Sequence, residues 1–225
     1  MKSLPGPLHE LMCRPDVHAL VFDLDGTLID SAADIIGGMR LTLSEAGVGE
    51  LPHDYIPDNL HGTTDGILRS IVNDMGWPMP ADLIPLRERY AFHYDSLDHR
   101  HTRLYPGVVE MLEHFSARVP LGICTNKRYV AADGATTKVG IRHHFHTISG
   151  ADTWPQAKPS PVPLLETLRV MGVEPQHCLY FGDTSADAEC AAQAGVRFVL
   201  HESGYGDARL HQFPRIHAFK GWVQP

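Results

Sequence analysis

Short apolar segments alternate along the chain with stretches that repeat apolar residues at helical spacing. Five of these segments are four to seven residues long and are followed by turn residues. They cover residues 18–23, 120–125, 146–149, 177–183 and 197–200. Continuous apolar runs of this length are typical of strands that are buried on both faces of a sheet. The pattern therefore predicts parallel strands.

Segments with helical periodicity lie between the later strands, and each of them ends at a glycine. They cover residues 129–140, 160–172 and 185–195. Glycine is the residue most often found just after the end of a helix. Strands that alternate with helices predict an α/β fold with a doubly wound, Rossmann-like parallel sheet.

The connection between the first two predicted strands is too long for a simple crossover. A crossover takes ~30 residues, whereas about three times that length separates Asp23 from Thr125. The intervening chain contains three segments with helical periodicity, which predict an inserted helical domain. We therefore expect an N-terminal tail at residues 1–17, a core domain formed by residues 18–32 and 105–225, and a small helical cap domain at residues 33–104.

Composition narrows the choice of partners and compartment. The chain has 27 acidic and 19 basic residues, and this charge balance argues against nucleic acid as a partner. No stretch approaches the ~18 apolar residues of a membrane span, and prolines interrupt the N-terminal segment where a signal peptide would be apolar. The four cysteines are widely spaced, which suggests neither a disulfide framework nor a zinc site. We expect a cytoplasmic monomer or homodimer that acts on a small molecule.

Polar residues follow the predicted strands directly, at the edge where ligands of open parallel sheets bind. They are Asp23, Asp25, Thr125, Asn126 and Asp183, and Lys158 precedes a helix at the same edge. Neighbouring carboxylates repel one another, so this group implies a divalent cation, and oxygen ligands beside a phosphate favour Mg²⁺. Hydroxyl, amide and ammonium groups opposite the acids suit the oxygens of a transferring phosphoryl group.

Four segments in order resemble the motifs of the haloacid dehalogenase-like hydrolases, particularly the phosphoglycolate phosphatase branch. They read "DLDGTLIDS", "CTNK", "AKPSP" and "FGDTSADAECAAQAG", and the resemblance spans residues 18–200. It implies that Asp23 attacks phosphorus and becomes an aspartyl phosphate. It also implies that Asp25 protonates the leaving oxygen, then activates water, and binds Mg²⁺ through its backbone carbonyl.

The same resemblance implies roles for the later motifs. Thr125 and Lys158 would hold the phosphoryl oxygens, and Lys158 would also orient the nucleophile. Asp183 would be the third metal contact from protein, after Asp23 and the backbone carbonyl of Asp25. Asp187 would support Asp183 without binding the metal itself. Its position four residues after Asp183 also fits a residue that only stabilises the first turn of a helix.

Residues beside these motifs complete the expected phosphate site. Gly26 would let the chain turn tightly next to the phosphate, since glycine tolerates conformations that other residues avoid. Thr27 would support this turn, and Asn126 follows the strand that ends at the phosphate-binding threonine.

The inserted domain is expected to act as a lid that closes over the phosphate and reads the rest of the substrate. Residues 31–104 contain six arginines and no lysine. A guanidinium can bind a carboxylate through two hydrogen bonds, and we expect Arg69 to do so, with Gly62 and Thr63 at the tip of the preceding loop. A solvated helix arginine is the alternative. The predicted substrate is 2-phosphoglycolate, which the resemblance also favours.

Other functions fit the residues less well. A haloacid dehalogenase lacks the second acid, so Asp25 favours phosphoryl chemistry, and a phosphonate hydrolase needs a cap lysine that residues 31–104 lack. A sugar-phosphate phosphatase or a phosphomutase shares the core motifs and stays an alternative. A signalling receiver domain is a remote one, because it needs neither the insert nor the paired aspartates. The histidine clusters at 99–101 and 142–146 are expected on the surface.

Overall fold

The computed structural model describes residues 12, 14–57, 60, 62–206 and 208–219. Residues 1–11 and 13 of the expected N-terminal tail lie outside this part. The chain divides into two compact units, one formed by Met1–Asp30 with Arg103–Pro225 and the other by Ser31–Thr102. In the following, these are called unit 1 and unit 2.

Unit 1 is built on a six-stranded sheet with the order β5-β4-β1-β6-β7-β8, in which every neighbouring pair is parallel. The strands are β1 (Ala19–Phe22), β4 (Leu121–Cys124), β5 (Thr147–Ser149), β6 (Cys178–Gly182), β7 (Arg197–His201) and β8 (Arg215–Ile216). The first five coincide with the predicted apolar segments. The doubly wound parallel sheet is thus confirmed.

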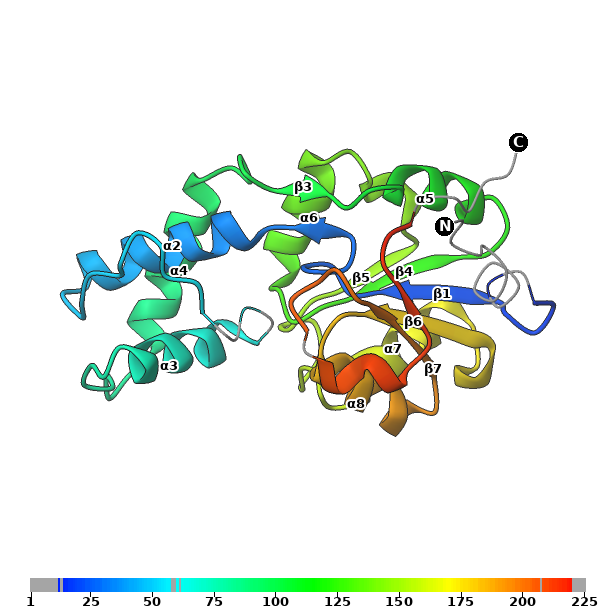
Figure 1. Cartoon of the computed structure of the whole chain (residues 1–225). Coiled ribbons are helices and arrows are strands. Elements are labelled where there is room, and N and C mark those ends of the chain that lie inside the picture. The colour runs from blue at the N-terminus through cyan, green and yellow to red at the C-terminus, as the bar shows by residue number, and fades with distance from the viewer. Residues whose placement is uncertain (1–11, 13, 58–59, 61, 207, 220–225) are drawn as a thin grey trace. The chain divides into compact units, whose positions relative to one another are not determined.

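Helices cover both faces of this sheet (Figure 1). They are α5 (Val108–Ser116), α6 (Tyr129–Lys138), α7 (Val162–Met171) and α8 (Ser185–Ala194). Leu20 and Phe22 of β1 pack with residues of α5 and α6, whereas Ala19 and Val21 pack with residues of α7 and α8. Because successive side chains of a strand point to opposite faces, a continuous apolar run fills both layers.

Unit 2 is helical. It contains α2 (Ala32–Glu45), α3 (Thr64–Asp74) and α4 (Ile84–Ser96). Met39 and Leu43 of α2 and Leu68 and Ile71 of α3 are fully buried, as their helical spacing predicts. None of the helices in the described part of the chain is long and apolar enough to cross a membrane.

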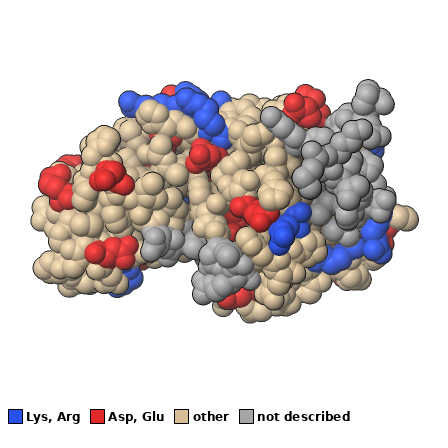
Figure 2. Space-filling model, viewed as in Figure 1, with Lys and Arg blue, Asp and Glu red and all other residues tan. Residues whose placement is uncertain are grey.

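The chain leaves and re-enters unit 1 through two short paired strands. These are β2 (Ile29–Asp30) and β3 (Arg103–Leu104), which pair antiparallel. The described part of the chain also contains three short 3₁₀ segments, Arg142–His144, Pro175–His177 and Ala208–Gln212. On the described part of the face shown in Figure 2, Lys and Arg form separate groups among acidic and neutral residues.

The expectation for the histidine clusters is wrong at one position. His143 and His146 are exposed, but His99 is buried, with 8% of its surface accessible. Asp98 and His99 both have a left-handed backbone, with φ of 51° and 50°. This turn places the His99 ring edge-on against Tyr94, with their centroids 5.3 Å apart.

Candidate active site

Three adjacent strands end in buried polar residues at one edge of the sheet. β1 lies between β4 and β6, and Asp23, Thr125 and Asp183 directly follow these strands. All three residues are buried. The backbone N–H of Asp23 donates to the carbonyl of Phe181 at 2.7 Å, so the strand pairing also fixes the peptide group of Asp23. The strand ends therefore assemble the group that the sequence pattern predicts.

Lys158 lies at the centre of a buried hydrogen-bond network. Its Nζ is 2.7 Å from Oδ1 of Asp23, 2.5 Å from Oδ1 of Asp187 and 3.0 Å from the Tyr180 hydroxyl. Burial opposes its charge, but the carboxylates of Asp187 and Asp23 outweigh this and raise the pKa of Lys158 above its ordinary value. Lys158 thus remains a cation and holds Asp23 in place.

Asn126 fixes the backbone of Lys158. Its Oδ1 accepts a hydrogen bond from the Lys158 N–H at 3.0 Å, and its Nδ2 donates to the Lys158 carbonyl at 3.2 Å. Asn126 was expected among the substrate-binding residues. Both ends of its amide instead bind the loop that carries the lysine, which makes it a support of the site in this structure.

Asp187 is held from several sides. Its Oδ1 accepts from Lys158 and from the Tyr180 hydroxyl at 2.7 Å. Its Oδ2 accepts from the Thr184 hydroxyl at 2.6 Å and from the backbone N–H groups of Thr184 and Asp183. Although burial opposes its charge, Lys158 and these donors lower the pKa of Asp187. The carboxylate is therefore ionised, and its lone pairs are committed to protein donors.

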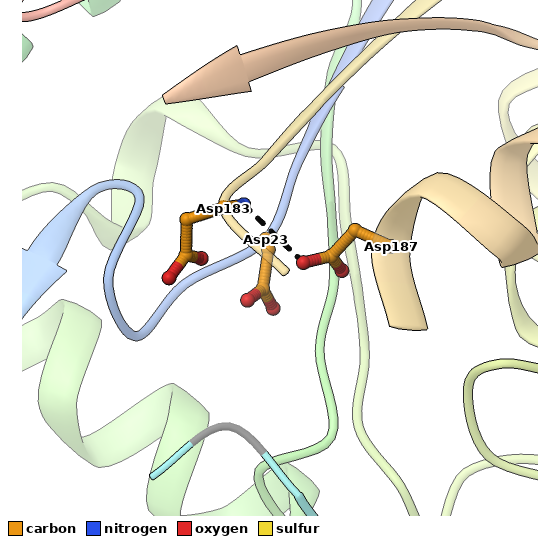
Figure 3. A group of neighbouring side chains, drawn as sticks. All are labelled: Asp23, Asp183 and Asp187. Carbon is orange, nitrogen blue, oxygen red and sulfur yellow. Dashed lines mark hydrogen bonds between the residues drawn. The ribbon is translucent and has the colours of Figure 1, made fainter. Parts of the chain in front are cut away.

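Asp23, Asp183 and Asp187 each place a carboxylate oxygen within 4.8 Å of the others, and all are buried (Figure 3). Burial raises the pKa of Asp23 to about 7, against the opposing effect of Lys158. Burial and the charge of Asp23 likewise raise the pKa of Asp183. Two buried carboxylates that resist ionisation fit a divalent, oxygen-seeking cation. Because the oxygens of Asp187 are already committed, Asp23 and Asp183 are the side chains suited to hold it.

Asp25 forms an ion pair that the sequence did not reveal. Both of its carboxylate oxygens lie 3.0 Å from Nζ of Lys127, the last residue of the "CTNK" motif. The side chains are only 12% and 7% exposed. Two different lysines, each from a loop that precedes a core helix, therefore hold the two aspartates of the first motif.

The turn after Asp25 packs directly on Asp183. Gly26 has a φ of +85°, and a Cβ at this position would overlap the Asp183 carboxylate. The Thr27 hydroxyl donates to Oδ1 of Asp183 at 3.0 Å, and the Tyr205 N–H donates to Oδ2 at 2.7 Å. Gly26 and Thr27, expected near the phosphate, thus position Asp183.

Residues of the site that the sequence did not identify include Tyr180, His201 and Tyr205. Tyr180 is an ordinary apolar residue in the pattern of β6, so nothing in the sequence separates it from the core. The segment from His201 to Gly206 carries a glycine-rich signal, "GYG", to which no chemistry could be assigned.

The predicted cap residues lie in unit 2. Thr63 is the N-cap of α3, and its hydroxyl accepts from the Gly66 N–H at 3.3 Å. Gly62 precedes it in the loop. Arg69 is exposed on α3 and makes no ion pair with any described residue.

Comparison with known proteins identifies relatives along most of the chain. The sequence profile of the haloacid dehalogenase-like hydrolases matches residues 20–201. A phosphoglycolate phosphatase of Aquifex aeolicus is 32% identical over 198 residues, which are 84% of this chain and 86% of that protein. A phosphoglycolate phosphatase of Rhodobacter capsulatus is 34% identical over 202 residues, which are 89% of this chain and 91% of that protein.

A solved structure shares the fold. It is described as a predicted phosphoglycolate phosphatase from Haemophilus somnus, and it superposes with a TM-score of 0.82 at 24% identity. The superposition covers 91% of this chain and 95% of that one. At this level of identity the likeness concerns the architecture alone.

Proposed function

The chain belongs to the haloacid dehalogenase-like hydrolases, in the branch of the phosphoglycolate phosphatases, and is a phosphoric monoester hydrolase. From this premise we propose that it hydrolyses a small phosphomonoester, 2-phosphoglycolate, through an aspartyl phosphate on Asp23 with the help of Mg²⁺. The observation that carries the proposal is the Lys158 contact to Oδ1 of Asp23. It fixes one carboxylate oxygen, and the other forms no hydrogen bond with any described residue.

The first half-reaction transfers the phosphoryl group to the protein. An oxygen of Asp23 attacks phosphorus, and the bond from phosphorus to the ester oxygen breaks. Asp25 donates a proton to the departing oxygen, while the Thr125 hydroxyl and the Lys158 ammonium donate hydrogen bonds to the phosphoryl oxygens. In the second half, Asp25 takes a proton from water, which attacks phosphorus and releases Asp23 and inorganic phosphate.

The cation would be held by the carboxylates of Asp23 and Asp183 and by the backbone carbonyl of Asp25. When bound, Mg²⁺ would supply positive charge to the phosphoryl oxygens. Asp187 is not proposed as a ligand of the cation, because its carboxylate binds Lys158 and the backbone at the start of α8. Lys127 holds the carboxylate of Asp25 in the same region.

A phosphate-release screen tests this function. Protein with Mg²⁺ is assayed on phosphoglycolate, sugar phosphates, nucleotides and pyrophosphate, and we expect the highest kcat/KM for phosphoglycolate. Asp23→Asn should lower turnover by at least about 10³-fold, because the amide cannot attack phosphorus. Asp133→Asn is the matched control, since Asp133 on α6 forms an ion pair with Arg142. A variant Asp23→Asn with more than a few per cent of wild-type turnover would contradict the nucleophile assignment.

The leaving group is proposed to be read by Arg69. Arg69→Ala should raise KM for phosphoglycolate by about tenfold and leave the turnover of a neutral aryl phosphate unchanged, because only the first ester carries a carboxylate. Arg89→Ala is the control, since Arg89 is bound to Glu45 within unit 2. Equal effects on both esters would remove Arg69 from the specificity site. Isomerisation of a sugar phosphate without net phosphate release would favour the phosphomutase alternative.

A further inference from the structure

The last residue of β7, His201, and the segment that follows it lie against the turn at Gly26. Nδ1 of His201 lies 2.7 Å from the Gly26 carbonyl oxygen. Three residues later, a Cβ at Gly204 would overlap both this carbonyl and the side chain of Asp183. The N–H of Tyr205 then donates to Asp183. Residues 201–206 therefore contact the turn and the acid at the same time.

The hydrogen bond defines the protonation state of His201. A carbonyl oxygen can only accept, so Nδ1 must carry the hydrogen. His201 is 1% exposed, and its Nε2 is buried with no hydrogen-bond partner among the described residues. A proton on Nε2 would bury a donor without an acceptor, which is costly. The ring is therefore the neutral Nδ1–H tautomer.

Aromatic packing holds the ring in this orientation. Phe219 stacks on it with an interplanar angle of 13° and a centroid distance of 5.4 Å. Tyr105 packs against it nearly edge-on, at 70° and 4.6 Å. With two rings around it, the imidazole has little freedom to rotate, so Nδ1 stays directed at the carbonyl.

The carbonyl of Gly26 belongs to the peptide group that also contains the N–H of Thr27. Thr27 in turn donates its hydroxyl to Oδ1 of Asp183 at 3.0 Å. On the other side, the Gly26 N–H donates to the Ile29 carbonyl at 2.8 Å. The hydrogen bond from His201 therefore fixes the peptide group between Gly26 and Thr27. The side chain of Thr27 in turn contacts Asp183 directly.

We propose that His201 is a positioning residue for the divalent-ion site: by holding the Gly26 carbonyl it sets the orientation of Thr27 and Asp183. The inference rests on the proposed function, because it concerns the same ion. It adds a role for a histidine that lies outside the four sequence motifs and touches none of the reacting atoms.

Two substitutions separate the hydrogen bond from the packing. His201→Asn keeps a nitrogen donor at the place of Nδ1 but removes most of the ring, whereas His201→Phe keeps a ring and removes the donor. Val199→Ala, in the buried core of the same strand, is the control for a general loss of stability. Mg²⁺ affinity is measured by calorimetric titration of each protein, and its melting temperature is measured without metal.

The affinity for Mg²⁺ should depend on the hydrogen-bond donor at position 201 and not on the presence of a ring there. We expect His201→Phe to weaken Mg²⁺ binding by about tenfold, the effect of one buried hydrogen bond. His201→Asn and Val199→Ala should melt at lower temperature but bind Mg²⁺ within about threefold of the wild type. Unchanged affinity in His201→Phe, or equal weakening in all three, would overturn the positioning role. Wild-type protein that binds no Mg²⁺ would instead contradict the proposed function.

The tautomer can be tested in the unaltered protein. Nitrogen NMR of the histidine-labelled chain distinguishes a protonated Nδ1 from a protonated Nε2. We expect Nδ1–H for His201, with a chemical-shift change when Mg²⁺ is added. An Nε2–H tautomer would overturn the proposal even if His201→Phe failed to fold, because Nδ1 could then not donate to Gly26.

Discussion

Individual residues of the site fix the two aspartates of the first motif separately. Lys158 holds Asp23 and Lys127 holds Asp25, and the two lysines come from different loops. Asp23 and Asp25 are only one residue apart, yet each carboxylate has its own cation. The positions of the two carboxylates are therefore set by separate contacts.

The role of Asp25 can be separated from that of Asp23 by changing the leaving group. Asp25→Asn cannot transfer a proton, and an alkyl leaving group depends on that proton far more than a phenolate does. We expect turnover of phosphoglycolate to fall by about 10³-fold and that of an aryl phosphate by about tenfold. Steady-state kinetics on both esters provide the measurement. If both esters lose the same factor, Asp25 does not protonate the leaving oxygen.

At the scale of an element, the start of α8 is shared between helix capping and the active site. The Thr184 hydroxyl accepts from the Asp187 N–H, and Oδ2 of Asp187 accepts from the Thr184 N–H, which forms a capping box. The Thr184 hydroxyl also donates to Oδ2 of Asp187. The same carboxylate binds Lys158. The residues that start the helix thus also orient Lys158, which holds Asp23.

Thr184→Ala should therefore affect both stability and catalysis. We expect the free energy of unfolding to fall by about 1 kcal/mol from the lost cap, and turnover to fall by about tenfold as Asp187 loses a donor. Thr184→Ser keeps the hydroxyl and should restore both quantities. Urea unfolding and phosphate release are measured side by side. A loss of stability with full turnover would show that Lys158 does not depend on the cap.

The elements also show what a sequence can reveal. The apolar runs at β1, β4 and β6 predict the strands, and parallel pairing then fixes where Asp23, Thr125 and Asp183 lie. β8 was not predicted, because a strand of two residues is too short to show a pattern of apolar positions. α5 was not predicted either, although Val108, Met111, Leu112 and Phe115 are buried along one face of it.

Side-chain directions in loops could not be predicted from the sequence. Lys127 belongs to the "CTNK" motif, but no pattern in the sequence indicates that its ammonium group contacts Asp25. His201 is one of 15 histidines and lies apart from both clusters. The role that we propose for it follows from the placement of Gly26 beside the end of β7, a contact between residues that are far apart in the sequence.

At the scale of the whole molecule, the buried acids link stability to pH and metal. Burial, opposed by Lys158, raises the pKa of Asp23 from 3.8 to about 7. Between about pH 4 and 7 the folded, metal-free protein thus binds more protons at Asp23 than the unfolded chain does. This contribution to stability is present at low pH and is lost as the pH rises through that window.

Mg²⁺ should bind more weakly in acid, because it must displace the proton of Asp23. With a pKa near 7, the apparent affinity at about pH 5.5 should be about 30-fold lower than at about pH 8. The Mg²⁺-induced rise in melting temperature should shrink accordingly. Asp23→Asn has no proton to displace at this position and should lose the part of the pH dependence that comes from Asp23, whereas the part from Asp183 should remain. The same thermal shift at both pH values would show that Asp23 is already ionised in the acidic sample.

The pairing of β2 with β3 has a consequence for how such a protein can be altered. Residues 31–102 leave and rejoin the chain at neighbouring strands, where Ile29 lies opposite Leu104. A segment whose ends are already held together can be exchanged for another of different length at a small cost in loop-closure entropy. Chimaeras joined at this pair should therefore retain the sheet of unit 1 while acquiring a foreign insert, and the substrate range that we propose for the insert should change with it.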